Sequence, residues 1–502
     1  PGERPDPVCM VARELKSGRL VRWWRDQLRS AAGPPYPTDD RDSLLVAYFA
    51  SAELGCHLAL GWRFPIRVID LYAEYAVKTN GYRSGRSLLN ALLSHGLDAI
   101  GAQEKDEMRA LVLRGGPWSD DERQAILDYC QSDVDALARL LPRMADGLSI
   151  GHALLRGRYM RAVAHMEHNG VPIDMPLLER IREGWDRIKA DLVRKVDSGF
   201  GVYDGLSFRQ DRFAAFLAGR SIPWPRLESG RLDLSDDAFR DRSRAYPDLE
   251  PLRAVRSALA QMRLSDFHVG TDGRNRTLLS PFSTKTGRNA PSNTRFVFGA
   301  ASWLRSLVRP PAGHGIAYID YSSQEIGIAA ALSGDQNLIE AYLSGDPYIA
   351  FAKQAGLVPP DATKHTHKAE RDRCKAVVLG VNYGMGAASL AMQIGCSEIE
   401  ARELLARHRR TYPKFWAWTG GVVDYAAVHG RLWSVFGWPL HVAGRLNARS
   451  WQNFPVQANG AEILRLACCL VTEAGIEVCA PVHDALLICA PLAELDETVA
   501  ET

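Results

Sequence analysis

Two aspartates lie where an exposed carboxylate could do chemistry. Asp320 closes a short apolar run, 315–319, that is typical of a strand, and Asp484 lies in the middle of a hairpin-like stretch, 479–489. Two carboxylates about 4 Å apart repel by about 4 kcal/mol at an effective dielectric near 20, so a protein that brings them together normally binds a cation there. Oxygen ligands suit Mg²⁺ better than zinc. The pair therefore predicts two Mg²⁺ ions, with Mn²⁺ as an alternative, and two-metal phosphoryl transfer.

Each aspartate also has a structural interpretation when it is taken alone. Asp320 could be the N-cap of a helix over 321–332, and Asp484 could be an ordinary turn residue. The catalytic interpretation therefore depends on the two residues meeting in space.

A stripe of basic and apolar residues lies between the two aspartates in the sequence. Arg371, Lys375, Leu379 and Tyr383 repeat every four residues, so they share one face of an expected helix. The cationic half of this face can bind a triphosphate, and the aromatic half can stack on a base. An ordinary amphipathic helix is the alternative, but it rarely carries Arg and Lys on its apolar stripe. The stripe favours nucleotide binding.

Three motifs in this order resemble the polymerase portion of the family A DNA polymerases, the group of bacterial DNA polymerase I and related phage enzymes. Asp320-Tyr321-Ser322-x-x-Glu325 resembles motif A of that family, Arg371 to Gly384 resembles motif B, and Val482-His483-Asp484 resembles motif C. Further similarities are Thr286-Gly287-Arg288, Met166 to Asp174, and Arg449-x-x-x-Asn453-x-Pro455-x-Gln457. The resemblance covers residues 155–490.

The resemblance implies a fold as well as an activity. The fold class would be mixed α/β (α+β), a right-hand polymerase with palm, fingers and thumb plus an N-terminal RNase H-like exonuclease-type domain. The implied divisions are 1–146 for the exonuclease-like domain, 147–175 for the palm entry, 176–270 for the thumb, 271–332 for the palm, 333–450 for the fingers and 451–502 for the palm again.

The resemblance also implies roles for single residues. Asp320 and Asp484 would bind the metal ions, and Lys375 would contact the α-phosphate and protonate the pyrophosphate. Glu325 would sit against the sugar and reject a 2′-hydroxyl. Nucleotide contacts are implied for Arg371, Lys375, Leu379, Tyr383, Glu325, Ser322 and Tyr348. DNA contacts are implied for Arg288, Arg449, Asn453 and Gln457 in the minor groove, with His483 at the primer end or supporting the turn at Asp484.

Some positions depart from the family pattern. Leu379 stands where an aromatic residue is usual, Tyr348 where a phosphate-contacting histidine is common, and Ala485 where an acidic residue follows the aspartate. None of them removes a metal-binding aspartate. We expect an active enzyme with altered rate or nucleotide selectivity.

The N-terminal part carries a weaker resemblance. Tyr129-x-x-x-Asp133 resembles the third motif of the DEDDy-type 3′→5′ exonucleases, and Glu53 would take the second acidic position. The first motif, Asp-x-Glu on an opening strand, is not in the sequence. Spacing alone fits a solvated helix pair equally well. Truncation and true loss both explain the missing motif, and we expect little or no proofreading.

The order of apolar runs predicts the elements around these motifs. Strand-like runs at 8–12, 43–50 and 66–71 alternate with helical ones at 88–93 and 121–141, which predicts an α/β module that ends near Pro142 and Gly147. Apolar residues at helical spacing over 177–196 predict one long amphipathic helix, and a helical arm with proline breaks follows over 206–272.

Composition restricts the class of protein. A chain of 502 residues suggests about three domains. The 61 basic and 59 acidic residues give a net charge of +2, which neither favours nor excludes a nucleic-acid partner. Nine cysteines without Cys-x-x-Cys spacing indicate reduced thiols and a cytosolic protein. No run of 18 apolar residues is present, so no membrane span is expected. The start at Pro1 suggests a fragment.

The leading hypothesis is a template-directed DNA polymerase of replication or repair. Its partners would be primer-template DNA and deoxynucleoside triphosphates, and it would act as a monomer in the cytoplasm of a bacterial or phage-infected cell. Two alternatives stay open: a related RNA polymerase, against which Glu325 counts, and a non-catalytic DNA-binding accessory that keeps the fold.

Overall fold

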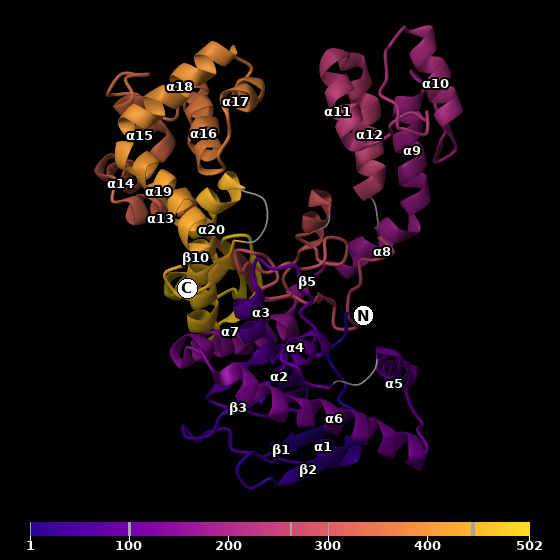
Figure 1. Cartoon of the computed structure of the whole chain (residues 1–502). Coiled ribbons are helices and arrows are strands. Elements are labelled where there is room, and N and C mark those ends of the chain that lie inside the picture. The colour runs from indigo at the N-terminus through magenta and orange to yellow at the C-terminus, as the bar shows by residue number, and fades with distance from the viewer. Residues whose placement is uncertain (1, 99–101, 262–263, 300, 443–446) are drawn as a thin grey trace. The chain divides into compact units, whose positions relative to one another are not determined.

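The computed structural model describes residues 2–98, 102–261, 264–299, 301–442 and 447–502, which form two compact units (Figure 1). The first unit comprises Gly170–Leu278 and Pro291–Ala312 with the N-terminal residues up to Glu3. The second comprises Arg4–Asn169, Leu279–Ala290 and Gly313–Thr502. The mixture of helices and strands confirms the predicted mixed α/β class.

A three-stranded antiparallel sheet lies at the centre of the second unit. Its strand order is β12-β13-β9, with β9 at His314–Asp320, β12 at Glu477–Val482 and β13 at Ala485–Pro491. β13 is the middle strand and is buried from Ala485 to Ala490, as its run of Ala, Leu, Ile and Cys predicts. The long helices α7 (Ile150–Asn169) and α20 (Ala448–Glu473) pack against β12 and each other. The predicted strand before Asp320 and the predicted hairpin around Asp484 are confirmed.

A helical subdomain with its own core follows β9. It is built from α13 (Gln324–Ser333), α14 (Gln336–Leu343), α15 (Pro347–Gln354), α16 (Lys368–Asn382), α17 (Ala387–Ile394), α18 (Glu398–Thr411) and α19 (Pro413–His429). Phe351, Tyr412 and Phe415 are buried in its core. The predicted helix with the four-residue repeat is confirmed as α16, with Tyr383 as its C-cap. A short hairpin, β10 (Arg431–Trp433) with β11 (Pro439–His441), follows α19, and α21 (Leu495–Glu501) follows β13.

Residues 4–146, called here the N-terminal module, belong to the second unit. β1 (Cys9–Arg13) pairs antiparallel with β2 (Leu20–Trp24), and β3 (Leu45–Ala47) pairs parallel with β4 (Val68–Asp70). The helices are α1 (Arg25–Ser30), α2 (Ser51–Ala59), α3 (Leu71–Thr79), α4 (Leu88–Ser94), α5 (Ala102–Arg114) and α6 (Asp120–Ala145). The α/β prediction is confirmed for this module.

Two predicted boundaries in the module were wrong. The run 43–50 forms only the three-residue strand β3, because the chain leaves the strand at Phe49, whose φ is 72°. Helix α6 continues through Pro142 to Ala145, since Leu140 and Met144 on either side of the proline are fully buried. Burial of that face offsets the local cost of the proline ring.

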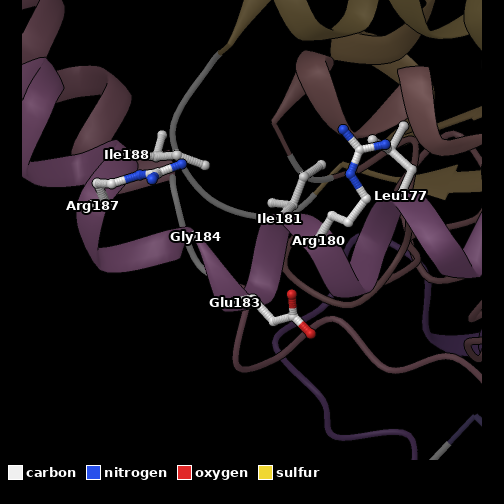
Figure 2. A pocket seen from close by; sticks show the side chains of 7 residues that line it. All are labelled: Leu177, Arg180, Ile181, Glu183, Gly184, Arg187 and Ile188. Carbon is white, nitrogen blue, oxygen red and sulfur yellow. The ribbon is translucent and has the colours of Figure 1, made fainter.

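The first unit contains a helical arm with a bend. The predicted single helix over 177–196 was wrong: α8 (Met175–Glu183) and α9 (Trp185–Asp197) are separated at Gly184, which leaves the helical conformation. Glycine costs about 1 kcal/mol in a helix interior relative to alanine, so it is a natural break. A pocket at the bend is lined by Leu177, Arg180, Ile181, Glu183, Gly184, Arg187 and Ile188 (Figure 2). None of the predicted site residues lines it.

The remaining elements of the first unit are short. They are β5 (Val171–Pro172) paired with β8 (Arg274–Asn275), β6 (Tyr203–Asp204) paired with β7 (Ser207–Phe208), α10 (Gln210–Gly219), α11 (Asp236–Ala245), α12 (Glu250–Gln261), and 3₁₀ turns at Pro247–Leu249 and Ser302–Leu307. Phe213 and Phe239 stack in the core of the arm. Of the helices that the structure describes in either unit, none is long and apolar enough to cross a membrane.

Candidate active site

The structure brings Asp320 and Asp484 together at one end of the central sheet. Asp320 is the last residue of β9 and lies opposite Ala485, the first residue of β13, so Asp484 is one residue from that pair. The backbone N–H of Tyr321 donates to the carbonyl oxygen of Asp484 over 3.4 Å. Helix α13 begins at Gln324 with Ser323 at its N-cap position, so Asp320 is not a helix cap. Register in the sheet therefore joins two acids far apart in sequence.

Burial and charge both act on this pair. Partial desolvation and the nearby Asp484 carboxylate raise the pKa of Asp320, and His483 offsets part of the effect. His483 has a φ of 58° in the turn between Val482 and Ala485. A histidine tolerates this left-handed conformation better than a β-branched residue does. The turn holds Asp484 beside the end of β9.

The donor set at the pair fits a hard divalent cation. Both side chains offer only carboxylate oxygens, and a cation would relieve the repulsion that raises the pKa of Asp320. Within the described ranges, no group of three or more His, Cys, Asp or Glu side chains could hold a metal ion. Water and substrate oxygens would have to complete the coordination, as is usual for Mg²⁺ in phosphoryl transfer.

Two cations of α16 lie over one aromatic ring. The guanidinium carbon of Arg371 is 5.2 Å from the ring centroid of Tyr348 and the Lys375 Nζ is 5.7 Å from it. Arg371 Nε also donates to Asp346 Oδ2 over 2.6 Å. The other oxygen of Asp346 accepts from the backbone N–H groups of Tyr348 and Ile349 at the start of α15. Asp346 thus fixes both Arg371 and the helix that carries Tyr348.

A polar network connects the end of α16 to α13. Glu325 Oε1 accepts from Arg288 Nη2 and from the Tyr383 hydroxyl, each over 3.1 Å. Gln457 lies near the Tyr383 hydroxyl and lowers its pKa. Partial burial and the charge of Glu325 raise the pKa of Tyr383. The network brings together four predicted site residues from four separate segments.

The other predicted residues fall around this network. Arg449, Asn453 and Gln457 are spaced by four on α20, and Arg449 lies so close to Gly384 that a side chain added there would meet its Cγ at 3.0 Å. Leu379 is half-buried on α16, and Ser322 is exposed between β9 and α13. The Asn453 Oδ1 is buried without a hydrogen-bond partner among the described residues.

The acids of the N-terminal module form a separate group. Glu53 lies on α2, and Tyr129 and Asp133 lie one turn apart on α6. Surrounding protein atoms and the charges of Asp70 and Asp133 raise the pKa of Glu53, although its side chain keeps access to solvent. Burial also raises the pKa of Asp133, and the charge of Lys105 offsets part of this increase. The structure thus brings Glu53 and Asp133 within electrostatic range of each other.

Sequence reasoning missed two aspartates that organise these sites. Asp70, which is 1% exposed, accepts from the N–H groups of Phe49, Ala50, Tyr72 and Ala73. Burial raises the pKa of Asp70 to about 6 even though these bonds favour the charged form. The second missed aspartate is Asp346. The sequence did contain a signal for it, because an aspartate followed by a proline is typical of a helix start.

The comparisons with known proteins agree with this geometry. Residues 266–502 match the family model of DNA polymerase family A. The thermostable DNA polymerase I of Thermus thermophilus is 27% identical over 427 residues, which cover 77% of this chain and 49% of that protein. The DNA polymerase I of Chloroflexus aurantiacus is 25% identical over 406 residues, covering 73% and 43%. The chain therefore spans about half the length of these curated relatives.

A solved structure extends the similarity to the whole fold. The POL domain of Pol1 from M. smegmatis, in complex with DNA primer-template and dNTP, superposes with a TM-score of 0.75 at 21% identity, covering 98% of this chain and 91% of that one. The chain shares the fold of that POL domain. Residues 266–502 are therefore similar to DNA polymerase family A, in agreement with the three motifs. The exonuclease resemblance of the N-terminal module stays a prediction.

Proposed function

We propose that this chain is a template-directed DNA polymerase that adds deoxynucleotides to a primer 3′-hydroxyl. It acts as a monomer on primer-template DNA with deoxynucleoside triphosphates as substrates. The observation that carries the proposal is the meeting of Asp320 and Asp484 at the end of the central sheet, with the Glu325 network joining that end to α16. The matches of residues 266–502 to the family support it.

The residues divide the chemical work by type. Asp320 and Asp484 would hold divalent cations, Mg²⁺ in the first place and Mn²⁺ as a substitute. Such ions would lower the pKa of the primer hydroxyl and offset the charge of the leaving pyrophosphate. Arg371 and Lys375 bind the triphosphate, and Lys375 donates a proton to the leaving group. The side chains of Arg371 and Lys375 both lie over the ring of Tyr348. This cation–π contact orients the two charges before the triphosphate binds.

Sugar selection falls to Glu325. Its carboxylate is held in one position by Arg288 and Tyr383. A rigid carboxylate beside the sugar excludes a 2′-hydroxyl by contact, whereas a mobile one would move aside. This supports deoxynucleotides over ribonucleotides as substrates. The same proposal assigns the minor-groove contacts to Arg288, Arg449, Asn453 and Gln457 and places His483 near the primer end.

The N-terminal module does not proofread in this proposal. Its acids have raised pKa values, and a protonated carboxyl group is a poor metal ligand. A primer with a mismatched 3′ end should keep its length when it is incubated with the protein and Mg²⁺ without nucleotides. Release of nucleotides that depends on Glu53 or Asp133 would contradict this part of the proposal.

Primer extension on a defined template, with each deoxynucleotide omitted in turn, tests the main proposal. Extension should stop one position before each template base whose partner is missing. Ribonucleotides should be incorporated poorly, and Glu325→Ala should relax that preference. Preferential use of ribonucleotides would favour a related RNA polymerase. DNA binding without extension would favour a non-catalytic accessory. A cytoplasmic location and a role in replication or repair belong to the same proposal.

A further inference from the structure

A turn of the N-terminal module packs directly on the segment that carries Arg288. The turn is Asn80-Gly81-Tyr82, between α3 and α4, and the segment is Leu279–Ala290. Asn80 is completely buried. Its Nδ2 donates to the carbonyl oxygens of Lys285 and Pro439, each over 2.6 Å. One side chain of the module therefore joins two distant segments of the polymerase domain.

The backbone of the turn also packs closely against the polymerase domain, at His441. The N–H of His441 donates to the carbonyl oxygen of Asn80 over 2.9 Å. A Cβ added at Gly81, whose φ is +100°, would lie 2.0 Å from the carbonyl oxygen of His441, so only glycine fits. The ring of Tyr82 stacks on His441 with centroids 4.7 Å apart and 16° between the planes.

Arg86, a few residues further along, completes the contact. Its Nη2 donates to Asn80 Oδ1 over 3.1 Å, which fixes the orientation of the amide. Its Nη1 donates to the carbonyl oxygen of Phe282 over 2.5 Å. All the polar groups of the Asn80 side chain are thus satisfied by partners that define one geometry.

On the polymerase side, the bonded carbonyl belongs to a tight turn that ends at Arg288. Gly287 N–H donates to the Thr284 carbonyl oxygen over 2.9 Å, and the Lys285 carbonyl oxygen also accepts from Trp438 Nε1 over 3.0 Å. Arg465 Nη1 donates to the Gly287 carbonyl oxygen over 2.7 Å. The two lone pairs of the Lys285 carbonyl are therefore used by Asn80 and Trp438. Arg288 follows in a backbone that has little freedom.

We infer that the N-terminal module is a positioning element for polymerization: Asn80, with Gly81 and Tyr82, holds the 284–288 turn so that Arg288 can reach both Glu325 and the terminal base pair. The inference rests on the proposed function, because it assigns Arg288 to the minor groove. It gives the module a task that needs no nuclease activity. Asn80 and Tyr82 act through Arg288 and touch neither substrate nor DNA.

A double-mutant cycle on primer extension tests this inference. Asn80→Ala should lower kcat/KM for a matched primer about ten- to a hundred-fold, since small displacements of a positioning contact have effects of that size. It should also weaken the discrimination between matched and mismatched primer ends. In an Arg288→Ala background, Asn80→Ala should have little further effect, because the side chain that it positions is gone.

Two variants at Tyr82 keep the test decisive if Asn80→Ala folds poorly. Tyr82 is 54% exposed, so Tyr82→Ala removes the stacking on His441 with little risk to folding. Tyr82→Ala should reduce matched extension and mismatch discrimination in the wild-type background only. Tyr82→Phe keeps the stacked ring and should behave as wild type, as should Leu93→Ala on the exposed side of α4. Melting temperatures of all variants should be recorded beside the rates.

The outcomes separate the inference from the proposed function. If the unaltered chain does not extend a primer, the proposed function fails and the inference fails with it. If the chain extends normally, and the Asn80 and Tyr82 variants either match wild type or reduce extension by the same factor with and without Arg288, only the inference is overturned.

Discussion

The two groups of acids in the second unit differ in how their charges are used. At the end of the central sheet, Asp320 is exposed at the end of β9 and Asp484 lies in a hairpin turn beside it. In the N-terminal module, Asp70 is 1% exposed and accepts from four backbone N–H groups. Asp320 thus remains exposed at the end of its strand, whereas Asp70 is used within its own fold.

Under the proposed function, this difference means that closeness of carboxylates is not by itself enough for a metal site. Asp70 is occupied in joining the loop at Phe49 and Ala50 to the start of α3, and its pKa of about 6 keeps part of it protonated near neutral pH. Glu53 and Asp133 also have raised pKa values. Metal binding requires deprotonated ligands, so such a group starts at a disadvantage. At the sheet pair, by contrast, Asp320 is exposed to solvent, although its pKa is also raised.

The largest expected effect is at the sheet pair. Asp320→Asn and Asp484→Asn should each reduce primer extension on the order of 10³-fold, because each removes a charge that stabilises the transferring phosphoryl group. Primer-template binding should be kept, and the melting temperature should not fall, since one partner of a repelling pair is neutralised. The comparison would break if either variant extended primers at a rate close to that of wild type.

Local patterns in the sequence were enough to predict the elements of this pair. The apolar runs before Asp320 and around Asp484 became β9 and the β12–β13 hairpin, and the four-residue repeat became α16. Each of these patterns lies within one segment and is dictated by periodicity. The meeting of Asp320 with Asp484 depended on sheet register, which the motif order of the family implied and no local pattern contained.

Long-range contacts could not be predicted in the same way. Asn80 bonds to carbonyl groups 205 and 359 residues away, and nothing in the sequence around it identifies those partners. The four N–H donors to Asp70 come from two segments of the chain. One of these segments begins at Phe49, which has a positive φ. Gly184 was a possible helix break in the sequence. The helical spacing of apolar residues on both sides of it nevertheless favoured one continuous helix.

The next expected effect is on the stability of the N-terminal module. Asp70→Ala should lower the free energy of unfolding by about 3–5 kcal/mol, because it removes a helix cap and leaves buried N–H donors without an acceptor. Urea denaturation, with hydrogen exchange of β3 and α3 as a local probe, measures the change. Asp320→Ala is the matched control and should change stability far less. Equal losses for the two variants would contradict the division between a structural and a catalytic acid.

The pH dependence of stability should sharpen the same contrast. Because the folded-state pKa of Asp70 is about 6, above the value of about 3.9 for an unperturbed aspartate, the folded protein binds more protons between these pH values. The contribution of Asp70 to stability should therefore decrease as pH rises, by about 1 kcal/mol from pH 5 to pH 7, and level off above. Unfolding of wild type and Asp70→Asn at both pH values isolates this slope. An opposite slope in the difference would mean that the four N–H donors outweigh burial.

The smallest effects are expected at Glu53 and Asp133. Glu53→Gln and Asp133→Asn should leave primer extension unchanged and shift stability by no more than about 0.5 kcal/mol, with a small gain where a like charge is removed. The two substitutions together should be additive within error if each residue acts alone. Shortening of a mismatched primer by wild type that either substitution abolishes would show that these acids bind metal despite their raised pKa values. In that case protonation could not be the property that separates the module from the sheet pair, and solvent access, which Glu53 retains, would have to decide instead.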